Sequence, residues 1–281
     1  METRVKTAFV LGGGGLLGAS EVGMLRALLE RAVVPDLIVG TSIGALNGAV
    51  LAADPSLEGD ARLADLWGNV EQSGVFSGSM LGRITTLART RTHAHAGEPL
   101  RELIEKRLTV SRIEDLKIEF QCVAASIELA AEHWFTEGPI ADAVLASSAV
   151  PGLLPPVRIG DEHFFDGGLV NSIPVDRAVS LGASLIYVLQ VGRIEQPLVV
   201  PTKAWEVGLV AFEIARRHRF AEEMKSLPSG VTAHVLPSGE DLRYNDLKQQ
   251  LRYSDASKVE ARIERAYAAS SEFLDDLGVT G

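Results

Sequence analysis

Short apolar runs alternate along the chain with longer segments whose apolar residues recur every three or four positions. The first run, at 5–11, predicts a buried strand, and the spacing over 16–32 predicts a helix that follows four consecutive glycines. A second apolar run at 35–40 and a segment rich in small residues at 41–53 repeat the order strand, turn, helix. Because such alternation is typical of strands that pair side by side in one direction, it predicts an α/β fold with a mostly parallel sheet.

The remaining elements continue this alternation towards the C-terminus. We expect further helices at 57–70, 98–108, 139–148, 174–183, 202–226 and 256–275, strands at 116–128, 130–138, 184–192 and 231–236, and a short strand that ends in a turn within 162–168. Residues 1–195 are expected to form the core unit. Residues 196–281 are expected to form a helical extension with one strand, packed on that core.

The charge balance narrows the classes of partner. The 281 residues carry a net charge of −10 and the sequence pI is near 5.2, which argues against nucleic acid, because phosphate binding depends on clustered lysine and arginine. The acidic balance also disfavours charge-driven docking on anionic lipid, while hydrophobic or transient contact stays open. The single cysteine, Cys122, excludes an internal disulfide framework and a thiolate-rich structural zinc site.

The N-terminus has the outline of a secretory signal, with Arg4 and Lys6 next to an apolar run. That run is short, is interrupted by glycines and lacks a clear A-x-A cleavage site. No stretch of the chain approaches the length of a membrane span. We therefore expect a cytoplasmic protein.

The glycine-rich loop contains G-x-G-x-x-G at 13–18, a pattern typical of dinucleotide-binding proteins. That function requires an acidic side chain at the end of the second strand, where it binds the ribose hydroxyls. The second strand ends in Gly-Thr-Ser, and Asp36 stands at its beginning, which is the wrong end of the sheet. Without its acidic partner the loop is weak evidence for a dinucleotide.

The sequence G-T-S-I-G at 40–44 lies between the second strand and its helix, where a nucleophile elbow is found. The flanking glycines lack the Cβ atoms that would clash in so tight a bend. Ser42 Oγ would project above the sheet beside the N-terminus of the following helix, whose backbone N–H groups favour developing negative charge. This context makes Ser42 a candidate nucleophile.

A serine nucleophile needs a base, and the D-G-G turn at 166–168 offers Asp166. Taken alone, such a turn is common and carries no chemistry. Histidine is the other common base, but only His218 and His234 follow Asp166, in a helical "ARRHRF" segment that we interpret as a solvated face and in an alternating strand. His93 and His95 lack an accompanying cluster of ligands, so we expect no metal site.

Taken in order, these motifs resemble those of the patatin-like phospholipases. The segments "ASSAVPGLLPPV" at 146–157 and "DGGLVNSIPVDRAVSLGA" at 166–183 are also similar to that family's, and the resemblance covers about residues 5–192. It implies a three-layer α/β/α fold and hydrolysis of lipid acyl esters through an acyl-serine intermediate, with no cofactor or metal. By the same resemblance, Ser42 is the nucleophile, Asp166 is its dyad partner, and the backbone N–H groups of Gly13, Gly14 and Gly15 form the oxyanion hole.

One position departs from the family pattern. The loop usually carries a basic residue where this chain has Leu17, so catalysis could be weakened, the cation could be replaced by another group, or the substrate preference could move towards uncharged esters. Two alternatives therefore stay open beside the hydrolase. The protein could be a non-catalytic lipid-binding or scaffolding member of the same fold, or a dinucleotide-binding oxidoreductase.

Two surface features allow more than one interpretation. The stretch at 74–91 mixes apolar and basic residues around Met80 and Leu81, so it could make transient membrane contact or be an amphipathic helix packed on the core. The amphipathic helix expected around 204–224 could pack on the sheet or form a dimer interface. The oligomeric state, the lipid head group and the acyl length stay open.

Overall fold

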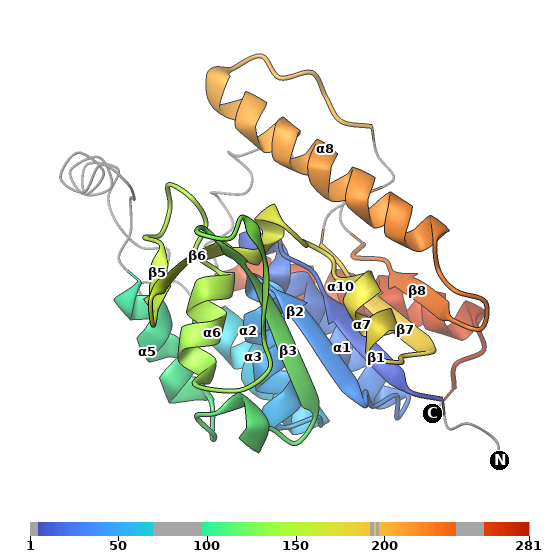
Figure 1. Cartoon of the computed structure of the whole chain (residues 1–281). Coiled ribbons are helices and arrows are strands. Elements are labelled where there is room, and N and C mark those ends of the chain that lie inside the picture. The colour runs from blue at the N-terminus through green and yellow to red at the C-terminus, as the bar shows by residue number, and fades with distance from the viewer. Residues whose placement is uncertain (1–4, 70–96, 192–193, 195–196, 240–255, 281) are drawn as a thin grey trace.

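A computed structural model describes residues 5–69, 97–191, 194, 197–239 and 256–280 (Figure 1). The stretch at 74–91, with Met80 and Leu81, and the pair His93 and His95 lie outside these residues. Within them, no helix combines the length and the apolar character needed to cross a membrane.

The described elements follow the order predicted from the sequence. The strands are β1 Thr7–Leu11, β2 Leu37–Thr41, β3 Glu119–Ser126, β4 Ala131–Phe135, β5 Val157–Ile159, β6 Glu162–Asp166, β7 Leu185–Leu189 and β8 Thr232–Leu236. The helices are α1 Ala19–Glu30, α2 Ile43–Ala53, α3 Leu57–Gly68, α5 Glu98–Arg107, α6 Ile140–Ser147, α7 Val175–Ser180, α8 Ala204–Lys225 and α10 Ala256–Asp276.

One sheet organises the molecule, with the strand order β5-β6-β3-β2-β1-β7-β8 and with β4 paired to β3. Strands β3, β2, β1, β7 and β8 run parallel, while β4, β5 and β6 are antiparallel to their neighbours. Strand β2 is buried along its whole length, as a central strand covered on both faces must be. The prediction of an α/β fold with a mostly parallel sheet is therefore confirmed.

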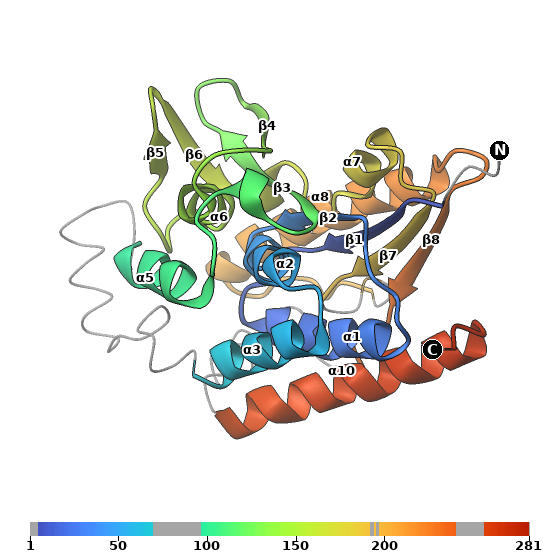
Figure 2. The ribbon, with the colours of Figure 1, turned by 90° about the horizontal axis from the view of Figure 1, so that it is seen from below.

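Helices cover both faces of this sheet. Alternate residues of β1 point to opposite faces: Phe9 and Leu11 belong to the core beneath α1, α2, α3 and α10, whereas Ala8 and Val10 belong to a second core beneath α7 and α8. Figure 2 shows α1, α3 and α10 on one side of the sheet and α7 and α8 on the other. The arrangement is the expected three-layer α/β/α sandwich.

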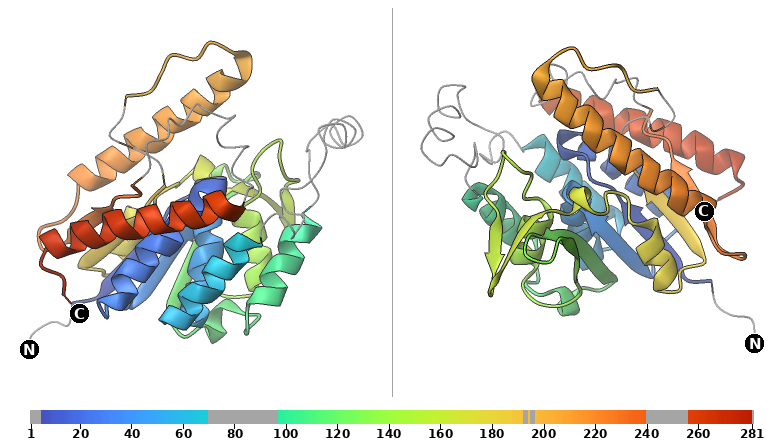
Figure 3. Two further views of the ribbon diagram at one scale, coloured as in Figure 1. Left: turned by 180° about the vertical axis from the view of Figure 1, so that it is seen from behind. Right: turned by 45° about the horizontal axis from the view of Figure 1, so that its top comes forward.

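The chain after residue 196 contributes to all three layers. Strand β8 pairs in parallel with β7 in the same sheet, α8 lies across one face, and α10 lies along α1 on the other (Figure 3). Helices α1 and α10 approach so closely at Gly23 that a Cβ there would overlap the Ile263 carbonyl oxygen and lie 2.6 Å from the Tyr267 nitrogen. The predicted division at 195 and 196 thus falls between two consecutive elements of one sandwich.

Two local differences from the predicted elements have physical causes. Strand β5 was not predicted, because its three residues follow a proline-rich stretch and form a strand only by pairing with β6. The helix expected at 16–32 is divided into a 3-10 turn, Gly15–Gly18, and α1. The turn places the glycine loop at the carboxyl end of β1.

Candidate active site

Two strand ends meet at the predicted dyad. Along β3, Thr41 of β2 pairs with Val123, and Asp166 of β6 pairs with the next residue, Ala124. Strand β4 pairs with both of these β3 residues, so it occupies the other edge of β3. The carboxyl ends of β2 and β6 therefore approach each other along one edge of β3, which brings Ser42 next to Asp166.

Ser42 lies in a tight bend between β2 and α2. Its φ of 56° and ψ of −121° lie in a region that non-glycine residues seldom adopt. A Cβ on Gly40 would lie 2.6 Å from the Gly44 carbonyl oxygen, and one on Gly44 would overlap the Leu11 carbonyl oxygen, so both flanking glycines are required. The Ser42 N–H donates to Ser147 Oγ at 2.8 Å, which holds the bend in place. The bend has the tight strand-to-helix geometry that a nucleophile elbow requires.

The Ser42 hydroxyl donates to Asp166 Oδ2 at 2.6 Å. The other carboxylate oxygen, Oδ1, accepts the Gly168 N–H at 2.7 Å, which fixes the carboxylate towards the serine. Both side chains belong to residues that are only 7% exposed. Burial raises the pKa of Asp166 from 3.8 to about 6, although the hydrogen bonds from Ser42 and Gly168 oppose that rise. A carboxylate with a raised pKa is a stronger base than an exposed one.

Histidine does not take part in this contact. Among the described residues, Ser42 Oγ bonds to Asp166 and to no imidazole. His218 is exposed on α8, and the His234 ring packs 5.6 Å from that of Tyr187. The serine and aspartate form a two-residue unit.

The glycine loop passes directly over Ser42. A Cβ on Gly13 would lie 3.4 Å from the Ser42 Cβ, and one on Gly14 would overlap the Val191 side chain. Gly15 has a φ of 57°, in the left-handed region that favours glycine. The loop backbone therefore lies next to Ser42, and at Gly14 it packs against Val191 too closely for a side chain.

The three predicted oxyanion donors are not equivalent. The Gly13 N–H donates to the Ser172 carbonyl oxygen at 2.9 Å and is therefore occupied, which differs from the role that the family resemblance gives it. Within the described part of the chain, the N–H groups of Gly14 and Gly15 donate to no acceptor. These two are the candidates for an oxyanion.

The position that departs from the family pattern is apolar and packed. Leu17 is 5% exposed, and residues 12–18 carry no charged side chain. Asp36, the acid considered for a dinucleotide, accepts the Thr7 N–H at 2.9 Å at the amino end of β1. It lies at the opposite end of the strands from the glycine loop, as expected, so the dinucleotide interpretation lacks its acidic partner here.

Three residues at the site were not identified from the sequence. Ser147 lies in the "ASSAVPGLLPPV" segment and bonds to the elbow. Arg216 of α8 donates to the Gly13 carbonyl oxygen at 3.3 Å, and Arg262 of α10 donates to the Leu16 carbonyl oxygen at 2.9 Å. The "ARRHRF" segment was interpreted as a solvated face, but Arg216 is only 6% exposed, so that interpretation was wrong for this residue.

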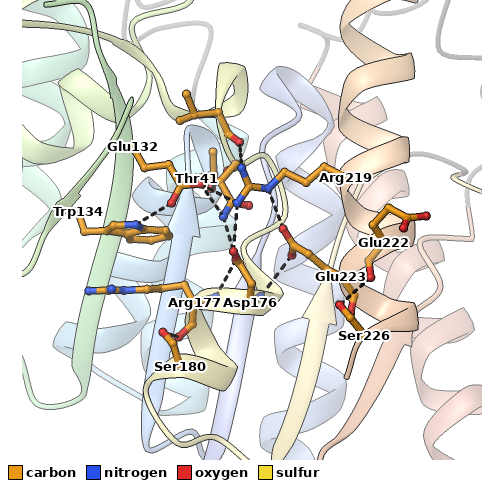
Figure 4. A network of polar contacts seen from close by, with 12 residues as sticks. Thr41, Glu132, Trp134, Asp176, Arg177, Ser180, Arg219, Glu222, Glu223 and Ser226 are labelled. Carbon is orange, nitrogen blue, oxygen red and sulfur yellow. Dashed lines mark hydrogen bonds and ion pairs between the residues drawn. The ribbon is translucent and has the colours of Figure 1, made fainter. Parts of the chain in front are cut away.

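A polar network attaches α8 beside the elbow (Figure 4). Thr41, which precedes Ser42, donates to the Asn171 carbonyl oxygen at 2.8 Å, and the Asn171 amide donates to Asp176 at 2.9 Å. Arg219 reaches from α8 to Asp176 at 3.0 Å and to Glu132 at 2.6 Å. The network links α8 to α7, to β4 and to the segment after Asp166.

Comparison with known proteins identifies the family. The Patatin-like phospholipase family matches residues 9–179, which is more than half of the chain. The chain belongs to the patatin-like phospholipase family. This stretch includes Ser42, Asp166 and the glycine loop, and it ends before α8.

Individual relatives match a similar part of the chain. Lysophospholipase nte1 of Aspergillus terreus is 33% identical over 186 residues, and Patatin-like phospholipase domain-containing protein 7 of Mus musculus is 35% identical over 187 residues. These alignments cover 66% of this chain but only 12% and 13% of the relatives. The crystal structure of VipD from Legionella pneumophila matches with a TM-score of 0.52 at 13% identity, over 98% of this chain and 67% of that one, which supports the fold.

Proposed function

We propose that this protein hydrolyses lipid acyl esters by means of a Ser42–Asp166 dyad and an acyl-serine intermediate. The observation that carries the proposal is the 2.6 Å hydrogen bond from the Ser42 hydroxyl, held in a strained elbow, to the buried Asp166 carboxylate. The names of the relatives support the substrate class, since one is a lysophospholipase and the other a phospholipase domain protein. No metal or cofactor takes part in the proposed chemistry.

The reaction follows from the positions of these groups. Ser42 Oγ attacks the ester carbonyl carbon while its proton passes to Asp166 Oδ2. The carbonyl oxygen becomes an oxyanion, which the N–H groups of Gly14 and Gly15 stabilise beside the N-terminus of α2. The tetrahedral intermediate collapses to acyl-serine as the alcohol leaves with the proton from Asp166. Water then attacks the acyl group, giving its proton to Asp166, and the carboxylic acid is released as Ser42 recovers its proton.

The test combines a serine probe with two kinds of ester. The purified chain is treated with a fluorophosphonate probe and assayed on 4-nitrophenyl butyrate and on lysophosphatidylcholine, with released fatty acid measured directly. We expect labelling and turnover, and a loss of roughly 10⁴-fold or more in Ser42→Ala. Ser180→Ala is the matched control, because that hydroxyl lies on α7 and, within the described residues, bonds only to the nearby Arg177 carbonyl oxygen.

The outcomes separate the proposed hydrolase from the other interpretations. Undiminished turnover in a folded Ser42→Ala protein would contradict the proposal. Saturable binding of lysophosphatidylcholine without labelling or turnover would favour the non-catalytic lipid-binding protein, for which Leu17 is the motivating observation. Transient membrane contact through the stretch at 74–91 stays a prediction, to be measured as a larger loss on vesicles than on soluble esters when Met80 and Leu81 carry charges.

A further inference from the structure

Two buried arginines from the C-terminal third reach the glycine loop. Arg216 on α8 is 6% exposed and Arg262 on α10 is fully buried. They approach from the two helical layers, and each donates to a loop carbonyl, Arg216 to that of Gly13 and Arg262 to that of Leu16. Both arginines lie beyond the residues that match the family, 9–179. A buried guanidinium group is costly unless it is fully bonded, so their placement calls for an explanation.

Arg216 holds several acceptors at once. Its Nε donates to Ser172 Oγ at 3.0 Å, its Nη1 to Glu213 at 3.0 Å, and its Nη2 to the carbonyl oxygens of Gly13 at 3.3 Å and Val191 at 3.5 Å. Ser172 in turn accepts the Gly13 N–H on its own carbonyl oxygen. The N–H and the C=O of Gly13 are therefore both held, one by Ser172 and the other by Arg216.

The hydrogen bond from Arg216 to the Gly13 carbonyl oxygen also sets the direction of the Gly14 N–H group. A trans peptide is planar, and its C=O and N–H bonds point in opposite directions. When Arg216 fixes the Gly13 carbonyl, it also fixes the Gly14 N–H, which is one of the two candidate oxyanion donors. A hydrogen bond to the carbonyl also polarises the peptide and strengthens its N–H as a donor. Consecutive glycines have wide conformational freedom, so the loop needs such a hold from outside.

The same contact supplies charge that the loop lacks. Residues 12–18 carry no charged side chain, and the family's basic position is Leu17. The Glu213 carboxylate is shared by Arg216 and Arg217, at 3.0 Å each. The Arg216 guanidinium group thus brings a positive charge into hydrogen-bond contact with the loop, at the Gly13 carbonyl oxygen. Positive charge in a buried environment lowers the free energy of an oxyanion.

We propose that Arg216 is a positioning residue for the glycine loop. From a helix outside the family-matched region, Arg216 orients and polarises the Gly13–Gly14 peptide. Arg262 holds the same loop from the opposite face, at Leu16. The proposal rests on the proposed ester hydrolysis. It assigns to the C-terminal third the cation that the loop itself does not carry.

Arg219 provides the matched comparison for a purely structural role. It lies one helical turn from Arg216 and attaches α8 through Asp176 and Glu132, while its pair with Glu223 lies within α8 (Figure 4). Within the described residues, Arg219 makes no hydrogen bond or ion pair with the glycine loop. Both arginines help to dock α8, and only Arg216 touches the loop.

The experiment compares Arg216→Met, Arg216→Lys and Arg219→Met by kcat, KM and thermal unfolding. Enzyme concentration is normalised by fluorophosphonate titration of Ser42. We expect Arg216→Met to lower kcat by about 10- to 100-fold with KM within about threefold, because the bound ester carries no oxyanion until Ser42 attacks it. Arg216→Lys should restore part of kcat, since it keeps the charge but replaces a fork with a single ammonium group. Arg219→Met should lower the Tm while keeping kcat within about threefold.

A pH profile adds a readout that a structural role would not give. Burial sets the raised pKa of Asp166, and Arg216 is not among the groups that shift it. The acid limb of kcat should therefore keep its midpoint in Arg216→Met while its plateau falls. A shift of the midpoint together with the plateau would indicate a disturbed dyad and would overturn the proposal.

The remaining outcomes are also decisive. Unchanged kcat in Arg216→Met beside Ser42-dependent turnover in the wild-type chain would overturn this proposal and leave the proposed function intact. Equal losses of kcat in Arg216→Met and Arg219→Met would show that docking of α8 is responsible. Absence of Ser42-dependent turnover in the wild-type chain would overturn both proposals. If Arg216→Met does not fold, Arg216→Lys carries the test, and a full wild-type kcat in that variant would exclude a need for the guanidinium fork.

Discussion

Residues 9–179 and the residues after α7 contribute different kinds of group to the same site. The first region carries the groups proposed to react, namely Ser42, Asp166 and the backbone of the glycine loop. The second region contributes two guanidinium groups that contact the loop without an open path to a substrate, because both are buried. The groups proposed to react therefore lie in the part of the chain that matches the family, whereas the arginines that contact the glycine loop lie outside it.

The second region is joined to the first at several levels. Strand β8 extends the parallel sheet beyond β7, and α10 lies against α1 with almost no space at Gly23. Helix α8 packs on the turn after Asp166, where Phe212 lies 3.1 Å from the position of a Cβ on Gly168. These contacts give the arginines a fixed frame from which to act on the loop.

After Ser42→Ala, the largest effect in the first region is expected from Asp166→Asn. Asparagine can accept the Gly168 N–H on its single oxygen, but its amide nitrogen then faces Ser42 Oγ as a donor and cannot act as a base. We therefore expect kcat on 4-nitrophenyl butyrate to fall by about 10³-fold. Asp161→Asn is the control, because that side chain is fully exposed on the turn between β5 and β6. An Asp166→Asn protein with the wild-type kcat would remove Asp166 from the mechanism and leave Ser42 to be tested alone.

The same substitution should stabilise the fold above neutral pH. Since the pKa of Asp166 rises from 3.8 to about 6 on folding, its contribution to stability is present below pH 4 and is lost as the pH rises through 6. Asparagine does not ionise, so at pH 8 the free energy of unfolding should increase on the order of 2 kcal/mol. Urea unfolding of the wild-type and Asp166→Asn proteins at pH 8 and pH 4 measures the difference. If the variant is no more stable than the wild type at pH 8, burial does not disfavour the ionised form of Asp166.

Much of the first region was predictable because its signals are local. G-T-S-I-G and D-G-G each specify a tight turn, and the structure has Ser42 and Asp166 at these turns, 2.6 Å apart through their side-chain oxygens. The meeting of β2 and β6 on one edge of β3 was not readable, since it depends on register between strands far apart in sequence.

The contribution of the second region could not be predicted in the same way. Arg216 stands in a run of basic residues that a solvated helix face would also show, and its burial depends on where α8 lies against a loop some 200 residues earlier. Arg262 presents the same difficulty, because its acceptor is a backbone carbonyl with no side-chain signature. Strand β5 was missed for a related reason, since only its partner β6 makes it a strand.

A substitution at the joint between the regions should have the next largest effect. Gly23→Ala places a methyl group against the backbone of α10, at Ile263 and Tyr267. Because both contacts are with backbone atoms, α1 and α10 must move apart to make room for it. We expect a loss of about 3 kcal/mol in the free energy of unfolding and a fall in kcat as Arg262 shifts with α10. Gly68→Ala is the control, because no atom of the described residues outside its own helix backbone and chain neighbours lies within 4 Å of its Cβ position. An unchanged stability in Gly23→Ala would mean that α10 is not tightly packed in solution.

The smallest effect is expected at Glu21, a second buried carboxyl group in the first region. Glu21 is fully buried on α1, one oxygen accepts the Asn47 amide at 2.7 Å, and burial raises its pKa well above the ordinary value. A neutral carboxyl group resembles an amide, so Glu21→Gln should change kcat by less than about threefold and stability by less than about 1 kcal/mol. Asp166→Asn provides the contrast, because the same chemical change there removes a base.

The Glu21 variant also decides how Arg216 acts. Arg216 is among the groups that lower the pKa of Glu21 against the effect of burial, so an ionised Glu21 would make Arg216 its counter-ion rather than a positioning residue for the loop. A double-mutant cycle of Glu21→Gln and Arg216→Met, read in both stability and kcat, separates these roles. Coupling below about 0.5 kcal/mol is expected if Glu21 is neutral. Coupling of about 2 kcal/mol or more would identify an ion pair between Glu21 and Arg216, because a lone buried charge is costly. Arg216 would then serve chiefly to neutralise Glu21 in the first region, and not to position the glycine loop.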